Sequence, residues 1–278
     1  METTTTLRNA GCSSEPLDAR LLLQQATDLD QLALITAMES HIGSEQLTAL
    51  ETMVERRCQR EPIAYILGYR HFWRHRFKSD RRALIPRPET EHLIETLLTL
   101  FPDKRAPLRL CDIATGSGCL AISIALEYPN ATVVATDIST DALALAAHNC
   151  QQLDATEQIT LLQGDLLAAL PECSAPFDAI ISNPPYVSSE EMDDLEPELS
   201  YEPTIALTDG GDGLSLLRQL LQDSPHHLHN RGYLLAETGV CGLPPLTDET
   251  PLTLKEEIID LAGRLRGGVW QHNSREPQ

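Results

Sequence analysis

The sequence lacks the marks of a membrane, secreted or metal-binding protein. No stretch of its 278 residues approaches the roughly 18 uncharged apolar residues of a transmembrane helix, so no membrane contact is expected. The opening residues, Met1-Glu-Thr-Thr-Thr-Thr, lack the basic start and apolar core of a secretory signal. The seven cysteines are scattered without a C-x-x-C pair, which favours reduced thiols in a cytoplasmic protein over disulfides or a zinc site. His226, His227 and His229 have no acidic or thiol partner in the same stretch, so no metal is expected.

Basic residues are also scarce. The chain has 21 Lys and Arg against 41 Asp and Glu, and this net charge of −20 argues against non-specific binding of nucleic-acid phosphates. The cations are unevenly spread, because ten of them and only two acids lie between Arg56 and Arg87. This basic segment is compatible with binding of an anionic partner on one face. The acidic run from Glu190 to Glu198 is interpreted as a solvated loop.

The hydrophobic pattern divides the chain into two parts. From Leu17 to Arg60 apolar residues recur at helical spacing, which predicts a small helical bundle. After Pro62 the pattern breaks up, and Pro86 and Pro88 predict a linker with a short hairpin. A helix is expected from about residue 89 to residue 100.

Beyond residue 107, short apolar runs alternate with helical patterns. This alternation predicts a mostly parallel sheet with helices on both faces, which binds ligands at the carboxyl ends of its strands. The expected strands are 108–113, 132–136, 159–162, 179–182 and 233–237, and the expected helices are 119–127, 141–150 and 214–223.

The first of these strands runs into a Gly-rich turn, Asp112-Ile-Ala-Thr-Gly-Ser-Gly118, and then directly into a helix. Such a turn brings backbone close to a ligand and offers amide donors, although it also fits a plain tight turn or another nucleotide site. Asp137 ends the next strand nineteen residues after Gly118, where a carboxylate can hold a ribose diol. It competes with Ser139 as a helix cap. The pair indicates an adenosine-containing cofactor.

The third and fourth strand ends complete the pattern. Asp165 and Leu166 can meet an adenine ring, the carboxylate at its amine and the apolar side chain at its face. The fourth strand opens into Asn183-Pro184-Pro185-Tyr186, where two prolines form a stiff loop with unpaired carbonyl acceptors. A planar –NH₂ group can donate one hydrogen to the Asn183 oxygen and the other to the Pro184 carbonyl. This loop predicts a site for an amide or an arylamine.

Together these motifs resemble the class I S-adenosylmethionine-dependent methyltransferases that methylate amino groups. Two upstream motifs, Glu61-Pro-x-x-Tyr-Ile-x-Gly68 and Leu84-Ile-Pro-Arg-Pro-Glu-Thr-Glu91, are similar to the HemK/PrmC family of peptide chain release factor N5-glutamine methyltransferases. The resemblance covers about residues 18–237. It implies an α/β fold: a Rossmann-like methyltransferase domain with a mostly parallel sheet at 89–278, preceded by an N-terminal helical substrate-recognition domain at 1–68 and a linker or hairpin at 69–88.

The resemblance also implies an activity and residue roles. The enzyme would use S-adenosyl-L-methionine to methylate the glutamine of the Gly-Gly-Gln motif in peptide chain release factors, a step of translation termination. Release factors would be its protein partners, and nucleic acid is not expected as a substrate. Asn183 and Pro184 would be catalytic, Asn183, Pro184, Pro185 and Tyr186 would bind substrate, and the cofactor would be held by Ala114, Thr115, Gly116, Ser117, Gly118, Asp137, Asp165, Leu166 and Asn183. Residues 87–90 would lie over the same pocket.

The chain departs from the family at two places. Ala114 stands where a Gly is expected, and its methyl group is tolerated if φ is negative. Pro244, Pro245 and Pro251 exclude the long helix expected after residue 240, although 260–270 resembles a last strand, so we expect the sheet to close with a weakened final layer.

Two other functions remain open at this point. One is methylation of adenine N6 or another exocyclic amine of a flipped nucleic-acid base, to which the same loop chemistry applies. The other is a methyltransferase-like protein that has lost catalysis and only binds.

Overall fold

The computed structural model describes residues 2–36, 41–171, 174–247 and 249–273. These fall into two compact units. Unit 1 consists of residues 1–69 together with the short segment Glu196–Tyr201, and unit 2 consists of residues 70–195 and 202–278. Unit 1 is therefore not one continuous stretch of chain.

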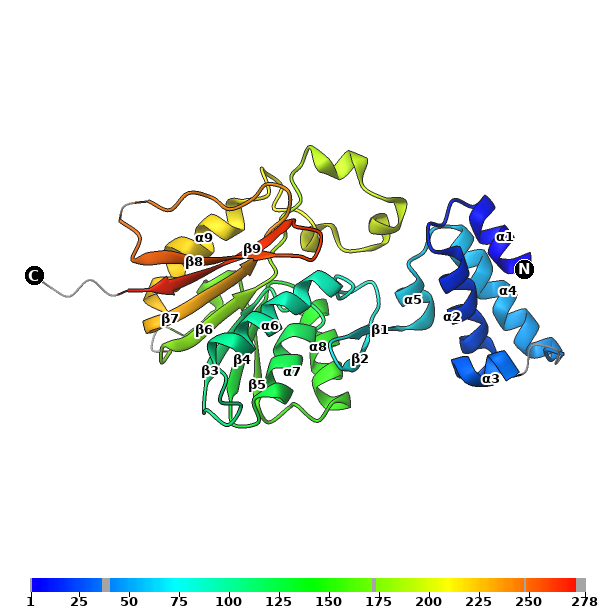
Figure 1. Cartoon of the computed structure of the whole chain (residues 1–278), viewed down its shortest axis with the longest axis horizontal. Coiled ribbons are helices and arrows are strands. Elements are labelled where there is room, and N and C mark those ends of the chain that lie inside the picture. The colour runs from blue at the N-terminus through cyan, green and yellow to red at the C-terminus, as the bar shows by residue number, and fades with distance from the viewer. Residues whose placement is uncertain (1, 37–40, 172–173, 248, 274–278) are drawn as a thin grey trace, which may run out of the picture. The chain divides into compact units, whose positions relative to one another are not determined.

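Unit 1 is a helical bundle, as the apolar spacing predicts. Leu22, Leu50 and Ile66 form the centre of its core. Gly68 ends the last helix in the left-handed conformation (φ 79°), which a residue without Cβ adopts at little cost. The helices are α1 (Glu2–Asn9), α2 (Glu15–Thr27), α3 (Gln31–Thr36), α4 (Ser44–Cys58) and α5 (Ile63–Leu67) (Figure 1).

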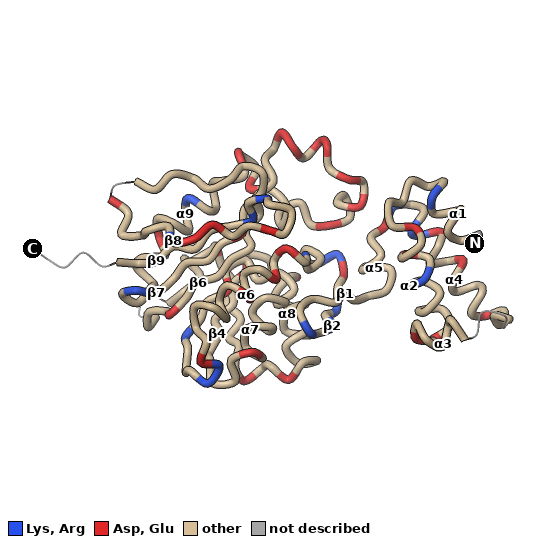
Figure 2. The backbone as a smooth tube through the Cα atoms, in the orientation of Figure 1, with Lys and Arg blue, Asp and Glu red and all other residues tan. Residues whose placement is uncertain are grey.

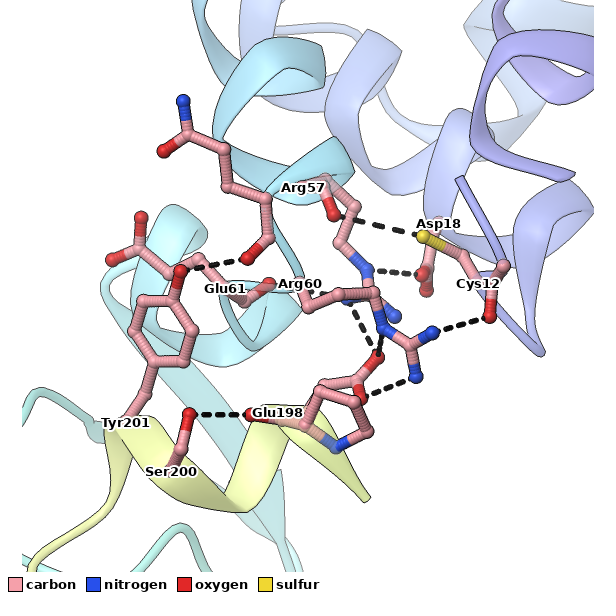
Figure 3. A network of polar contacts seen from close by, with 11 residues as sticks. Cys12, Asp18, Arg57, Arg60, Glu61, Glu198, Ser200 and Tyr201 are labelled. Carbon is pink, nitrogen blue, oxygen red and sulfur yellow. Dashed lines mark hydrogen bonds and ion pairs between the residues drawn. The ribbon is translucent and has the colours of Figure 1, made fainter. Parts of the chain in front are cut away.

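A buried ion-pair network ties the segment Glu196–Tyr201 into unit 1 (Figure 3). The Arg57 side chain is only 6% exposed and donates to Asp18 Oδ2 at 2.7 Å and to Glu198 Oε1 at 2.9 Å. Arg60 binds both oxygens of Glu198, at 2.8 and 2.6 Å. Tyr201, which ends the short helix η4 (Pro197–Tyr201), donates its hydroxyl to the Gln59 carbonyl. Glu198 thus neutralises cations that α4 and the turn after it bring into the interior.

Unit 2 is built on one seven-stranded sheet in the order β5-β4-β3-β6-β7-β9-β8. The first five strands in this order are parallel, whereas β9 is antiparallel to both β7 and β8. The mostly parallel sheet predicted from the sequence is confirmed. The strands are β3 (Arg109–Ile113), β4 (Thr132–Asp137), β5 (Ile159–Gln163), β6 (Phe177–Ser182), β7 (Leu228–Glu237), β8 (Leu252–Ile259) and β9 (Leu265–His272).

Helices cover both faces of this sheet (Figure 1). Leu110 and Val133 face a core shared with α6, α7 and α8, and the next residues, Cys111 and Val134, face a second core shared with α9. This alternation follows from the two-residue period of a strand, and burial on both faces explains the apolar runs in the sequence. The helices are α6 (Glu91–Leu100), α7 (Cys119–Glu127), α8 (Thr140–Gln152) and α9 (Ser215–Asp223).

The linker and the carboxyl-terminal region add shorter elements. The linker contains the hairpin β1 (Tyr69–Phe72) and β2 (His75–Lys78), followed by the 3-10 helix η1 (Pro88–Thr90). Between β7 and β8 the described residues form no helix, in keeping with the prolines there. The sheet closes with the hairpin of β8 and β9, whose outer strand carries exposed acidic residues (Figure 2). Val269 and Trp270 of β9 are buried, and the expectation of a weakened last layer stays a prediction.

Two further findings bear on the sequence-based expectations. None of the described helices combines the length and apolarity that a bilayer crossing needs. Six cysteines are free thiols, and Cys173 lies outside the described residues.

Two of the non-glycine residues with a positive φ lie in turns at the carboxyl edge of the sheet. Ala114 has φ +59° and Leu166 has φ +45°, both in the left-handed region. The condition for tolerating an alanine at 114, a negative φ, is therefore not met. Strain of this kind is typical of functional turns.

Replacing Ala114 with Gly should relieve this strain. An alanine in the left-handed conformation costs about 1–2 kcal/mol. Glycine also raises the conformational entropy of the unfolded chain, which offsets about 0.4–1 kcal/mol of the stabilisation. We expect Ala114→Gly to stabilise unit 2 by roughly 0.5 kcal/mol or more. Both tryptophans, Trp73 and Trp270, lie in unit 2, so urea unfolding followed by tryptophan fluorescence measures this change. The exposed Ala262→Gly is the control and should destabilise; equal losses in both variants would contradict the strain.

Removing a member of the ion-pair network of unit 1 should change stability more than the substitution at Ala114 does. Asp18→Ala leaves the buried Arg57 charge with fewer partners, and we expect it to destabilise unit 1 by about 3 kcal/mol. Glu15→Ala removes a pair with the 64% exposed Arg8 and should change the stability of unit 1 much less, because solvent screens this pair. Helical circular dichroism during urea unfolding should reveal the loss, while the tryptophan signal of unit 2 keeps its midpoint. Similar losses in the two variants would show that the buried network is not special.

Candidate active site

A cavity opens at the carboxyl ends of β3, β4, β5 and β6. Its walls are the turns after these strands, linker residues 82–87 and part of the loop 203–209. Of residues 87–90, Arg87 and Thr90 also line it, whereas Pro88 and Glu89 do not. Gly118, Pro184 and Tyr186 do not line the cavity but neighbour residues that do. The predicted site residues in the lining are Ala114, Thr115, Gly116, Ser117, Asp137, Asp165, Leu166, Asn183 and Pro185.

Several backbone amides of the Gly-rich turn donate hydrogen bonds to other groups of the protein. The Thr115 amide donates to the Thr136 carbonyl and the Gly116 amide to Asp137 Oδ2, both at 2.9 Å. The Gly118 amide donates to the Thr115 carbonyl. The expectation that the turn offers free donors is therefore wrong for these three amides. This turn does not have the open amide nest of a phosphate site.

Gly118 serves packing. It has φ +78° and precedes α7, and a Cβ at this position would lie 3.1 Å from the Cβ of Ala146 on α8. A side chain would push the two helices apart. Its contribution to the cavity is therefore to seat α7 close behind the turn.

Asp137 projects from the end of β4 and does not cap α8. Ser139 is the cap, because its hydroxyl accepts from the Ala142 amide at 3.2 Å. The Asp137 carboxylate instead accepts the amides of Gly116 and Ser139 at 2.9 Å each, which fixes it at the rim of the cavity. Burial raises its pKa.

The other charges in the cavity are mainly acidic or paired. Asp112 is 1% exposed, accepts from the Thr115 hydroxyl at 2.6 Å and has its pKa raised to about 7 by burial. Arg82 is paired with Asp80, and Arg87 with Glu202. Because its cations are already neutralised, the cavity suits a cationic or neutral ligand better than a phosphate.

Glu202 was missed by sequence reasoning. It is buried, accepts the Ile85 amide at 2.9 Å and pairs with Arg87 at 2.5 Å. It thereby fastens the linker to the loop after β6, and both segments contribute to the cavity wall. The residue lies just after the acidic run, so its sequence context gave no sign that it differs from solvated acids.

Asn183 enters the cavity with its orientation fixed from behind. Its Nδ2 donates to Thr90 Oγ1 at 2.9 Å, and the Thr90 hydroxyl donates to Glu237 Oε2 at 2.7 Å. The Tyr186 hydroxyl donates to the other oxygen of Glu237 at 2.9 Å. A Cβ on Gly239 would lie 2.7 Å from the Tyr186 ring, so only glycine permits this packing. Pro184, which lies between Asn183 and Tyr186 in the sequence, is buried.

The role of Glu237 was also missed. An acidic residue that ends an otherwise apolar strand, Tyr233-Leu-Leu-Ala-Glu237, is a signal that could have found it. Its partner Thr90 was noted within the motif at 84–91, but without a contact. In the part of the chain that the structure describes, no group of three or more His, Cys, Asp or Glu could hold a metal ion.

Both parts of the chain match known protein families. Residues 1–68 match the PrmC N-terminal domain family and residues 90–228 match the methyltransferase small domain family. The N-terminal domain of human METTL16 in complex with SAH has the same fold, with a TM-score of 0.51 at 20% identity over 72% of this chain and 76% of that chain.

Relatives that match over most of this chain have a higher sequence identity to it. A release factor glutamine methyltransferase of Rhodopirellula baltica is 38% identical over 95% of this chain and 92% of its own length. Another, of Neisseria gonorrhoeae, is 40% identical over 91% of this chain and 92% of its own length. With a matching N-terminal domain, a methyltransferase sheet and relatives of this similarity over nearly its whole length, the chain belongs to the HemK/PrmC family of release factor glutamine methyltransferases.

Proposed function

We propose that this protein methylates the side-chain amide nitrogen (N5) of the glutamine in the Gly-Gly-Gln motif of peptide chain release factors, with S-adenosyl-L-methionine as methyl donor. Family membership supports the activity. The observation that carries it in this chain is that Asn183 and the Gly-rich turn line one cavity. An amide acceptor therefore lies beside a turn suited to an adenosine cofactor.

The residues around the cavity fit this cofactor. When bound, S-adenosylmethionine supplies an electrophilic methyl group on a positively charged sulfur. Asp137 would hold the ribose hydroxyls, because its carboxylate retains acceptor capacity at the cavity rim. The exposed Asp165 and the strained, apolar Leu166 would meet the adenine amine and ring. Residues 114–117 and Asn183 would line the rest, and the nearby acidic groups favour a cation.

The Asn183-Pro-Pro-Tyr loop would act on the substrate amide. An amide nitrogen is a poor nucleophile because its lone pair is delocalised into the carbonyl. Asn183 Oδ1 and the Pro184 carbonyl would accept its two hydrogens and stabilise positive charge as it develops on the nitrogen. Holding the amide in place also replaces a bimolecular encounter. The methylated nitrogen becomes acidic, so water can take its proton and no dedicated base is required.

The helical unit would recognise the protein substrate, with a boundary to the linker near residue 68. Support comes from exposed apolar side chains, which α3 and the start of α4 carry in place of burying them. The most exposed are Leu32 at 71% and Ile35 at 57%. Residues 69–88 would remain the linker and 89–278 the methyltransferase domain.

The two alternative functions have less support. For a nucleic-acid base as substrate, the likeness to METTL16 concerns the fold alone, and the cavity cations Arg82 and Arg87 are already paired. For a binding protein without catalysis, the argument is that Ala114 and the proline-rich residues 240–254 depart from the family pattern. The positive φ of Ala114 supports this alternative, whereas the presence of Asn183 and Asp137 in one cavity lining supports catalysis.

Asn183→Ala should abolish turnover while leaving cofactor binding nearly unchanged. It removes an acceptor that is used as charge develops on the nitrogen, which corresponds to about a 100- to 1000-fold loss of kcat. The assay incubates the protein with purified release factor and methyl-labelled cofactor, and mass spectrometry maps the modified residue. Near-normal methylation of the Gly-Gly-Gln glutamine by the variant would refute the mechanism.

Asp137→Asn should have the opposite profile. Loss of charge-assisted hydrogen bonds to the ribose costs about 1.5–3 kcal/mol, so the cofactor Kd should rise roughly 10- to 100-fold. The kcat at saturating cofactor should change little. Calorimetric titration with the cofactor measures this directly, with the exposed Asp141→Asn as matched control. An unchanged Kd would remove Asp137 from the cofactor site.

A further inference from the structure

We infer that Thr90 and Glu237 are positioning residues, which hold the Asn183 side chain so that its oxygen faces the substrate. The inference rests on the proposed function, because it assigns a role in the same site. It concerns two residues that are far apart in sequence and that need not touch the reacting atoms. They act through Asn183 and Tyr186.

The geometry leaves one consistent arrangement of hydrogens. Glu237 is 2% exposed and Thr90 is 3% exposed, so both depend on protein partners. An ionised carboxylate can only accept, so it takes the hydrogens of the Thr90 and Tyr186 hydroxyls. Thr90 has a single hydroxyl hydrogen, which is then committed. Its oxygen can therefore only accept from Asn183, and it does so from Nδ2 at 2.9 Å.

This chain of donors sets which end of the Asn183 amide is available. With Nδ2 bound to Thr90, Oδ1 is left as the acceptor for a substrate –NH₂. If Glu237 were neutral, it could donate to Thr90, and Thr90 could then donate to Oδ1 of a rotated Asn183 amide. The amide would present its own –NH₂ to the substrate, so donor would meet donor. The charge on Glu237 thus selects the productive orientation.

Glu237 also titrates in a useful range. Its pKa is raised to about 7, mainly by burial and also by the nearby Glu89 carboxylate. The hydrogen bonds from Thr90 and Tyr186 and the charge of Arg266 act in the opposite direction. Because the carboxylate is the productive form, kcat should fall as the pH drops through about 7.

The test compares four variants in the full-length protein with release factor as substrate. Glu237→Gln and Thr90→Val should each lower kcat about 10- to 100-fold, the size expected for a misplaced reacting group. Thr90→Ser keeps the hydroxyl and should stay within threefold of the parent. The exposed Glu256→Gln is the charge-matched control and should be unchanged. Cofactor Kd should remain within twofold throughout, which also shows that the variants are folded.

A pH profile separates positioning from mere structural support. The acid limb of kcat should vanish in Glu237→Gln and persist in Asp112→Asn. Asp112 lines the cavity and is a second buried carboxyl group whose pKa is raised to about 7. A limb that follows Asp112 instead would overturn the inference. So would normal kcat in Glu237→Gln, or equal losses in Thr90→Ser and Thr90→Val.

A second readout needs no substrate. The side-chain ¹⁵N–¹H signals of Asn183, identified by their loss in Asn183→Ala, should shift with pH around 7 in the parent and not in Glu237→Gln. If these signals titrate but release factor is not methylated, the proposed function fails and the positioning holds. If methylation occurs and the signals ignore Glu237, the positioning fails and the function holds.

Discussion

Five parallel strands that end at one edge of a sheet are the constraint on which the site depends. Each strand end delivers one part: the Gly-rich turn after β3, Asp137 at β4, the Asp165–Leu166 pair after β5, the Asn183 loop after β6 and Glu237 at the end of β7. Both faces of the sheet are occupied by apolar packing. Polar side chains from distant parts of the sequence can therefore gather where the strands stop.

Buried carboxyl groups give this edge its electrostatic character. Burial raises the pKa of Asp112, of Asp137 and of Glu237, and each of them accepts hydrogen bonds from neighbouring groups. The arginines in the wall already have carboxylate partners. The result is a site with acceptors and little free positive charge, which matches a sulfonium cofactor and an uncharged amide more closely than a nucleotide phosphate.

Local sequence patterns predicted the parts of the fold that local physics decides. The helix expected at 119–127 has these bounds in the structure, because a Gly-rich turn starts it and its apolar residues are continuous. Ser139 and Asp137 could not be ranked as caps from sequence, since both side chains can accept from a helix amide. The sign of φ at Ala114 depends on how the turn is held by Thr136 and Asp137, which no local pattern encodes.

Contacts between residues far apart in the chain could not be predicted either, because local patterns do not encode them. Thr90 and Glu237 are 147 residues apart, and Arg57 and Glu198 are 141 apart. Each residue alone has an ordinary interpretation: a threonine before a helix, an acid at a strand end, an acid in a polar run. Only the packing of β7 beside β6, and of η4 within unit 1, shows which partner each residue has.

The composition of unit 1 has a practical consequence for dissecting the protein. A fragment cut after Tyr69 would contain Arg57 and Arg60 but not the carboxylate of Glu198 that binds both of them. In such a fragment the buried Arg57 would keep the Asp18 carboxylate and the Glu61 carbonyl as partners but lose the second carboxylate. The helical unit is thus completed by a segment that lies more than a hundred residues further along the chain. A truncation after residue 69 would remove this segment from the unit to which it belongs.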